Sequence, residues 1–136
     1  MGLIMKQLKI EGDKGSDEAS TLFDTGATSS FMRREKAEKV ATILPLPHTK
    51  RFELADAGKA IEVTEGIRID FIIDGTTLSD EVFVVDNLSE EFIIGANTLQ
   101  KWRIKLDLEN DKVIIDEKAV KMKLVTIASV RGEEKK

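Results

Sequence analysis

The sequence predicts an all-β domain whose strands form a closed, barrel-like sheet with one or two short helices at its margins. Most of the chain consists of short stretches in which apolar and polar residues alternate, and this two-residue period indicates half-buried strands. Turn-forming residues separate the stretches, most clearly Asp74-Gly75, a dipeptide typical of tight hairpins. Residues 33–41 and 98–102 lack this alternation and favour helix instead.

The composition is that of one globular domain. With 136 residues, of which 41% are hydrophobic, the chain is long enough for one core and too short for two. We expect a single domain over residues 1–130 and a charged, disordered tail over residues 131–136. The net charge of −4 does not favour nucleic acid or an anionic membrane as a partner.

Several kinds of site are excluded by what the chain lacks. There is no cysteine, which rules out disulfides and thiolate metal sites. The single histidine, His48, lies between Pro47 and Thr49 in a predicted loop. It cannot form a zinc site alone, and a serine triad built on it would lack a nucleophile elbow. No apolar stretch is long enough to span a membrane, and the first residues do not resemble a signal peptide. We therefore expect a cytoplasmic protein without a metal or cofactor.

The first predicted element is a hairpin. Leu8 and Ile10 alternate with polar residues, as in a strand. Residues 11–18 are polar and contain glycine, which predicts a turn. The apolar stretch 19–23 is the returning strand, and it delivers Asp24 to the end of the hairpin.

A helix is predicted next. Ser29 or Ser30 can cap it, and the good helix formers of residues 33–41 continue it. Its charged residues are expected to face solvent, and its inward face to consist of Ala37, Val40 and Ala41. Pro45 and Pro47 end the helix and begin a loop.

The middle of the chain is predicted to form a series of hairpins. Residues 51–63 alternate on both sides of a glycine-bearing tip and form the first hairpin. Residues 67–71 and 78–85 form the next pair, joined by Asp74-Gly75. Residues 82–85 are continuously apolar, as in a strand that is buried on both faces.

The last third begins with an apolar run that ends in Gly95. Asn97 can cap the short helix over residues 98–102. Three further strands are predicted, over residues 104–108, 113–115 and 120–127.

One motif within this pattern carries chemistry. The strand that ends at Asp24 is followed at once by Thr25-Gly26-Ala27. Gly26 allows a close backbone approach that a side chain would block, and the neighbouring hydroxyls can bond nearby backbone and fix the loop. The carboxylate of Asp24 would then lie on a rigid loop. An ordinary strand that ends in an Asx-type turn would have the same residues.

At these residues the sequence resembles a known family. Asp24-Thr25-Gly26-Ala27 resembles the active-site loop of the retropepsin-like aspartic proteases. Ile93-Ile94-Gly95-Ala96, followed by Leu99 and Trp102, resembles the later hydrophobic-hydrophobic-glycine element of that family and the short helix after it. The resemblance covers residues 6–116 and implies the closed acid-protease barrel, assembled as a two-fold homodimer.

The resemblance also implies roles for individual residues. Asp24 would be the catalytic carboxylate, Thr25 would brace the two loops across the dimer axis, and Gly26 would supply an amide near the carboxylate. The hairpin tip at residues 55–60 would be a mobile flap that pairs with an extended peptide; from its sequence alone it could equally be an ordinary surface hairpin. The implied substrate-binding residues are Ala27, Ala55, Asp56, Ala57, Gly58, Lys59 and Ile93. Ile93 could equally be a plain core residue.

The chemistry itself requires two carboxylates. Peptide hydrolysis by this route needs an acid and a base side by side, and two carboxylates about 3 Å apart share one proton, as in aspartic proteases generally. The chain has one Asp-Thr-Gly; Asp70, Asp74 and Asp107 lie in turn-like or solvent-facing positions. The second carboxylate is therefore expected from a second copy of the chain, in an isologous dimer.

Three functions remain open at this point. The first is a homodimeric aspartic endopeptidase that acts on extended peptides. The second is a catalytically silent relative that dimerises or binds peptide. The third is an unrelated β-rich binding module, which would be a stable monomer indifferent to the loss of Asp24. The charged end, Arg131 to Lys136, differs from viral members, whose terminal strands interleave, so the resemblance leaves the dimer interface undefined.

Overall fold

The computed structural model describes residues 3–54, 59–116, 118, 120 and 121. Within them the elements follow in the order β1 (Leu3–Gly12), β2 (Gly15–Asp24), β3 (Phe31–Arg33), α1 (Arg34–Val40), β4 (Leu44–Leu54), β5 (Lys59–Ile73), β6 (Thr76–Val85), β7 (Phe92–Ile94), α2 (Ala96–Lys101), β8 (Lys105–Asp107) and β9 (Lys112–Ile114). The prediction of a mostly-β chain with one or two short helices is confirmed, but β1, β2, β4, β5 and β6 are longer than the predicted short strands, at 10 to 15 residues each.

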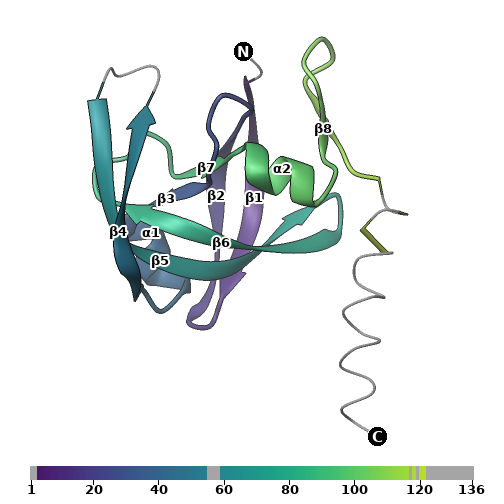
Figure 1. Cartoon of the computed structure of the whole chain (residues 1–136). Coiled ribbons are helices and arrows are strands. Elements are labelled where there is room, and N and C mark those ends of the chain that lie inside the picture. Colours follow the sequence, from purple (N-terminus) through teal and green to yellow (C-terminus); the bar gives the residue numbers. More distant parts are fainter. Residues whose placement is uncertain (1–2, 55–58, 117, 119, 122–136) are drawn as a thin grey trace, which may run out of the picture.

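Six of the strands close into a barrel. The main sheet has the order β1-β2-β7-β3-β6-β5-β4, and an additional pairing of β1 with β5 joins the ring. β4 extends the sheet beyond β5 as an edge strand, and β8 and β9 form a separate two-stranded sheet. Figure 1 shows the barrel with α2 beside it and the β8–β9 hairpin next to α2. The predicted barrel-like all-β fold is therefore correct.

The first hairpin is longer than predicted. β1 and β2 pair from Leu3 opposite Asp24 to Gly12 opposite Gly15, so the turn is only two residues long and the predicted turn over residues 11–18 is wrong. These residues are polar because this end of the hairpin lies at the surface, where backbone pairing needs no apolar side chain. Gly12 is required by packing, because a Cβ there would lie 2.3 Å from the carbonyl oxygen of Val40.

The helix α1 forms as predicted, but its start differs. Ser30 does not cap it; an extra short strand, β3, intervenes, and Arg33 occupies the N-cap position without a side-chain cap hydrogen bond. The predicted inward residues Ala37, Val40 and Ala41 are buried. Lys36, expected on the solvated face, is also buried, because two carboxylates lie within reach of its ammonium group.

Residues 45–48 form part of a strand, although the two prolines predicted a loop. Pro45 and Pro47 lie in β4, and the pairing register with β5 shifts between Pro45 and Lys50. Proline is tolerated there because β4 is an edge strand, where a missing N–H need not break a ladder on both sides. His48 is exposed in this strand.

The barrel divides the apolar residues into two clusters. The larger one fills the interior and includes Phe23, Phe71, Phe92 and Trp102. The smaller one centres on Phe31, Val63, Leu88 and Ile93, with Leu22, Ala27, Leu46, Phe52, Ile61, Phe83 and Val85 packed against it. Val82 and Val84 face the first cluster while Phe83 and Val85 face the second, which confirms that this part of β6 is buried on both faces.

The C-terminal part agrees with the prediction as far as residue 116. The predicted strands over 104–108 and 113–115 are β8 and β9, which pair as an antiparallel hairpin. The strand predicted from residue 120 is wrong at its start, because Lys118, Val120 and Lys121 are helical. Residues 122–127 and the tail 131–136 lie outside the described residues. None of the helices in the described part is long and apolar enough to cross a membrane.

Candidate active site

Asp24 is the last residue of β2, at the point where the first hairpin meets β7. β2 runs parallel to β7, with Phe23 opposite Ile94. The half-buried Asp24 accepts a hydrogen bond from the amide of Gly26 at 2.8 Å through Oδ1. Its backbone carbonyl accepts the amide of Ala27 at 3.2 Å. The turn predicted after Asp24 is thus present, and it orients the carboxylate through its own loop.

The loop that follows Asp24 is packed directly against Gly95. A Cβ on Gly95 would lie 2.2 Å from the carbonyl oxygen of Ser29 and 2.8 Å from that of Ala27. Two amides at the start of α2 bond the same loop: Ala96 donates to the carbonyl of Ala27 at 2.7 Å, and Asn97 donates to the carbonyl of Thr28 at 3.0 Å. Glycine is therefore required at position 95, and the loop and α2 behave as one unit.

A chain of buried hydroxyl groups strengthens this junction. The Gly95 amide donates to Ser30 Oγ at 3.1 Å, and Ser30 Oγ lies 2.8 Å from Thr98 Oγ1. Thr98 donates its hydroxyl proton to the carboxylate of Asp80, so Ser30 is the donor to Thr98. Ser30 and Thr98 are both buried, and the chain of donors ends on a negatively charged acceptor.

These supporting residues were missed in the sequence. The sequence predicts a helix cap at Ser30 and an ordinary strand residue at Asp80. Asn97 was predicted to cap α2, but Gly95 occupies the N-cap position without a side-chain cap hydrogen bond, and Asn97 is exposed. The available signal was the pair of hydroxyl residues 30 and 98 beside the two glycine motifs, but a single sequence does not link positions so far apart.

The other predicted site residues divide into three groups. Thr25 and Gly26 are exposed on the loop. Ala27 and Ile93 pack in the smaller apolar cluster beside it, with Ile93 opposite Leu22 of β2. The predicted flap residues Ala55, Asp56, Ala57 and Gly58 lie outside the described residues, and Lys59 begins β5 opposite Leu54.

The strands that lead to the predicted flap extend toward the same end of the barrel as the site. Figure 1 shows the open ends of β4 and β5 and the start of β1 at one end of the molecule, and Leu3 at that start is paired with Asp24. Phe52 of β4 packs edge-on against Phe31 at 5.0 Å between ring centroids. The hairpin is therefore anchored to the cluster that underlies the loop.

A partly buried ion cluster supports the other end of β2. Lys36 Nζ lies 2.9 Å from Asp17 Oδ2 and 3.4 Å from Glu91 Oε2. The amide of Ser20 donates to Glu91 at 2.7 Å, and this bond, together with Lys36, holds the pKa of Glu91 below its usual range. Burial alone would lower the pKa of Lys36, but the two carboxylates outweigh it and the net shift is upward. The cluster is structural, because it fixes α1 and the residue that precedes β7 to the strand that carries Asp24.

Chemically, the site offers one carboxylate on a rigid, accessible loop beside an apolar cluster. The part of the chain that the structure describes contains no group of three or more histidine, aspartate or glutamate side chains arranged to hold a metal ion. The arrangement can hold and orient an acid or base at the open end of the barrel.

Comparisons with known proteins identify the family and the fold. The family model described as Ty3 transposon peptidase matches residues 4–131. The fold is similar to the crystal structure of the retroviral protease-like domain of Ddi1 from Leishmania major, with a TM-score of 0.62 and 18% identity over 85% of this chain and 90% of that chain. It is also similar to EIAV protease complexed with the inhibitor HBY-793, with a TM-score of 0.54 and 18% identity over 79% of this chain and 94% of that chain. At these identities the two structures establish the shared fold.

Proposed function

Because the chain belongs to the retropepsin-like aspartic protease family, we propose that it is an aspartic endopeptidase whose active site is completed by a second copy of the chain. The observation that carries the proposal is the placement of Asp24. Its carboxylate lies on a loop that is fixed by the Gly26 amide and by Gly95, beside an apolar cluster and at the open end of the barrel. A fixed and accessible carboxylate is what acid–base catalysis requires.

The reaction needs the Asp24 carboxylates of both copies. At about 3 Å apart, the pair holds a single proton, because both groups cannot ionise together. The ionised member takes a proton from water, and the resulting hydroxide attacks the peptide carbonyl. The protonated member donates to the carbonyl oxygen. As the intermediate collapses, the carboxyl that took the proton from water gives it to the leaving amine, and the other carboxylate takes its proton back as the carbonyl re-forms. No metal or cofactor takes part in this scheme.

The expected substrate is an extended peptide segment. The β4–β5 hairpin reaches the same end of the barrel as the Asp24 loop (Figure 1), and an extended peptide can pair its backbone with such a hairpin. Ala27 and Ile93 would line the cleft, Thr25 would brace the paired loops, and the tip at residues 55–59 would close over the peptide. The similarity to a protease structure that contains an inhibitor supports a cleft in this position.

One observation favours a second candidate, a catalytically silent dimer that binds peptide. The hydrogen bond from the Gly26 amide to Asp24 Oδ1 gives this carboxylate a structural role in the turn. A chain that had lost its activity could therefore keep Asp24 for its fold.

The substitution Asp24→Asn separates the two candidates. Asparagine can accept the Gly26 hydrogen bond through its own Oδ1 but cannot act as a base. We expect cleavage of a diverse peptide mixture, measured from acid to neutral pH, to fall by at least about 100-fold while the unfolding curve is unchanged. The matched control is Asp74→Asn in the exposed β5–β6 turn, where asparagine tolerates the positive φ. Equal cleavage by Asp24→Asn and the wild type would refute the mechanism. A folded wild-type dimer that cleaves no peptide would favour the silent candidate.

A further inference from the structure

A groove opens where β5 and β6 separate. Their antiparallel pairing stops at Gly66 opposite Phe83. Beyond this pair β5 continues along β4, while the end of β6 runs beside β3, so the two strands diverge. The space between them, which we call the β5–β6 groove, has a volume of about 550 Å³. Residues 61, 62 and 64 of β5 line one side of it, and residues 84–89 line the other.

The β5–β6 groove runs along the edges of the two strands rather than over one face. Ile61 packs in the smaller apolar cluster, whereas the exposed Glu62, as the next residue of the strand, points to the opposite face. Both line the groove, and so do Val84 and Val85, which pack in different clusters. Within the described residues, this edge of β5 pairs with no strand between residues 61 and 64. An unpaired strand edge is a template for an added strand.

Two neighbouring arginines fix the loop that forms the far side of the groove. Arg34 is bonded to Asp86 at the start of this loop and to Glu65 of β5. Arg33 donates from Nε to the carbonyl of Leu88 at 2.8 Å and from Nη2 to the next carbonyl at 2.5 Å. These two carbonyls are therefore already occupied, and the edge of β5 is the side of the groove with which an added strand can pair.

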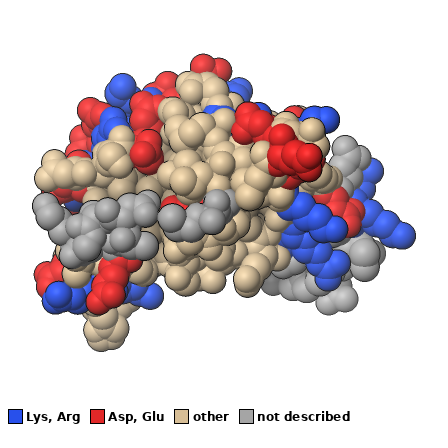
Figure 2. Space-filling view, turned by 90° about the horizontal axis from the view of Figure 1, so that it is seen from above, with Lys and Arg blue, Asp and Glu red and all other residues tan. Residues whose placement is uncertain are grey.

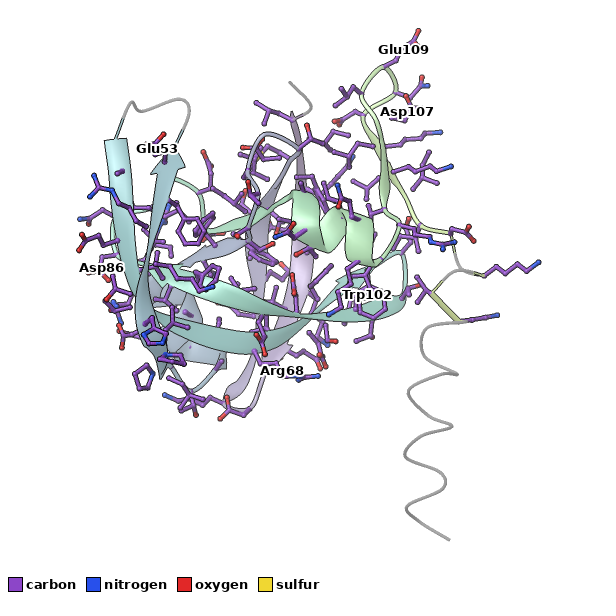
Figure 3. The ribbon with its side chains drawn as sticks, in the orientation of Figure 1. Glu53, Arg68, Asp86, Trp102, Asp107 and Glu109 are labelled. Atoms are coloured by element: carbon purple, nitrogen blue, oxygen red, sulfur yellow. The ribbon has the colours of Figure 1, made fainter. Side chains whose placement is uncertain are left out.

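The groove lies at the side of the molecule, and no described residue of the Asp24 loop lines it. Figure 3 shows Asp86 beside the β4–β5 hairpin, on the opposite side of the barrel from Asp107 and the β8–β9 hairpin. Viewed from above in Figure 2, uncharged side chains form most of the described surface in the middle of the molecule, and charged ones gather around its margin. A charged ligand would therefore find its counter-charges at the margin.

The groove carries an excess of negative charge. Glu62, Asp86 and Arg34 line it, and Glu65 is bonded to Arg34, so three carboxylates share one guanidinium. Arg34 is already occupied by Glu65 and Asp86. Arg51 lies opposite Glu62 in β4, but the ion pairs found among the described residues do not include these two. A basic side chain that enters the groove would therefore meet an available carboxylate at Glu62.

We propose that the β5–β6 groove binds an extended segment of a partner protein in which lysine or arginine alternates with apolar residues. The segment adds a strand to the free edge of β5, and main-chain hydrogen bonds hold it there. Residues directly opposite each other share one face of a sheet, so the basic side chains lie opposite Glu62 and the apolar ones lie beside Ile61 and Leu88. This inference does not depend on the proposed peptidase function, because it uses no residue of the Asp24 loop. 

The experiment measures the binding of two labelled peptides by fluorescence anisotropy. In the first peptide lysine alternates with valine, and in the second glutamate replaces every lysine. We expect the wild type to bind the lysine peptide at least about tenfold more tightly, or about 1.4 kcal/mol. The same measurements on Asp24→Asn exclude cleavage of the peptides as the source of the signal, and this variant should bind both peptides as the wild type does.

A charge reversal at Glu62 provides the decisive comparison. Glu62→Lys places like charges opposite each other in the complex with the lysine peptide, and its dissociation constant should rise about tenfold. The glutamate peptide should bind this variant more tightly than it binds the wild type, a gain that local misfolding cannot produce. Glu38→Lys makes the same charge change on the exposed face of α1 and should leave both dissociation constants unchanged.

A lysine peptide that is N-methylated at every residue tests strand addition, because it cannot donate main-chain hydrogen bonds; it should not bind detectably. Equal binding of the methylated peptide would overturn strand addition, and equal binding of the lysine peptide by the wild type and Glu62→Lys would overturn the groove. If the wild type lost affinity for the peptide as its own concentration rose, a second copy would occupy the groove and the assignment to a partner protein would be wrong. Failure of the wild type to cleave any peptide would count against the peptidase function alone.

Discussion

The substitution Gly95→Ala tests whether the Asp24 loop is held by direct contact with the chain beneath it. The Cβ of alanine would lie 2.2 Å from the carbonyl oxygen of Ser29, 2.7 Å from the carbonyl carbon of Ser29 and 2.8 Å from the carbonyl oxygen of Ala27. All three contacts are with backbone, so no side chain can rotate away. To bring the shortest contact to 3.0 Å, the loop must retreat by about 0.8 Å.

This displacement predicts a loss of stability and a separate loss of cleavage activity. Overpacking of a closely packed interior typically costs about 1–3 kcal/mol of unfolding free energy. The retreat also moves the residues next to Asp24, and a misplacement of about 1 Å in an active site can cost about 100-fold in rate. We therefore expect Gly95→Ala to lose about 1–3 kcal/mol by urea unfolding, and the folded fraction to lose most of its cleavage activity.

The control is Gly75→Ala, which strains the backbone without creating a steric contact. Gly75 has φ of +79° in the β5–β6 turn, and a Cβ there would meet nothing within 4 Å. Alanine should cost about 1 kcal/mol through backbone conformation alone and leave the activity of the folded protein intact. Wild-type stability and activity in Gly95→Ala would refute the argument that loop position depends on this glycine.

Two further predictions concern the supports of the site. Thr98→Val removes the donor to Asp80 and the acceptor of Ser30, and should cost about 1–3 kcal/mol by urea unfolding because buried polar groups lose their partners. Thr98→Ser keeps the hydroxyl and should retain more stability; a valine variant as stable as the wild type would contradict the hydroxyl chain. The pKa of Glu91 is lowered in the folded protein, so its stabilisation is present above the unfolded pKa of about 4.3 and is lost as the pH falls through the folded pKa. The unfolding free energy of the wild type should therefore decrease more steeply on acidification than that of Glu91→Gln, and parallel pH profiles would exclude this contribution.

Alternation along the chain was sufficient to predict the strands that have one apolar face. It identified the β5–β6 hairpin, the β8–β9 hairpin and the barrel-like architecture. The turn after Asp24 could also be predicted, from the glycine and the hydroxyl residues that follow it. The pattern failed where tertiary contacts replace local signals. Pro45 and Pro47 fit a strand only because β4 is at the edge. Ser30 bonds Gly95 and Thr98 across the fold, although its place before a helical stretch predicts a helix cap.

The supports of the candidate site were harder to predict than the site itself. Asp24 and Gly95 each belong to a short motif with a recognisable composition. Asp80 and Lys36 do not, because a charged residue in an alternating strand or helix is ordinarily solvent-facing. Their burial or bonding depends on partners that are brought near only when the barrel closes.

The closure of the barrel also determines where the chain can change in length. β1 is paired with β2 along its whole length and with β5 at Lys9–Glu11, so a residue inserted in β1 would break one register or turn its side chains to the opposite face. The Asp13-Lys14 turn is held by bonds to residues 40 and 42. By contrast, Asp74-Gly75 joins β5 and β6 where a side chain on Gly75 would meet no neighbour. Inserted residues and affinity tags should therefore be accepted at residues 74–75 and rejected in the first hairpin, which makes that turn the place to attach a probe without moving Asp24.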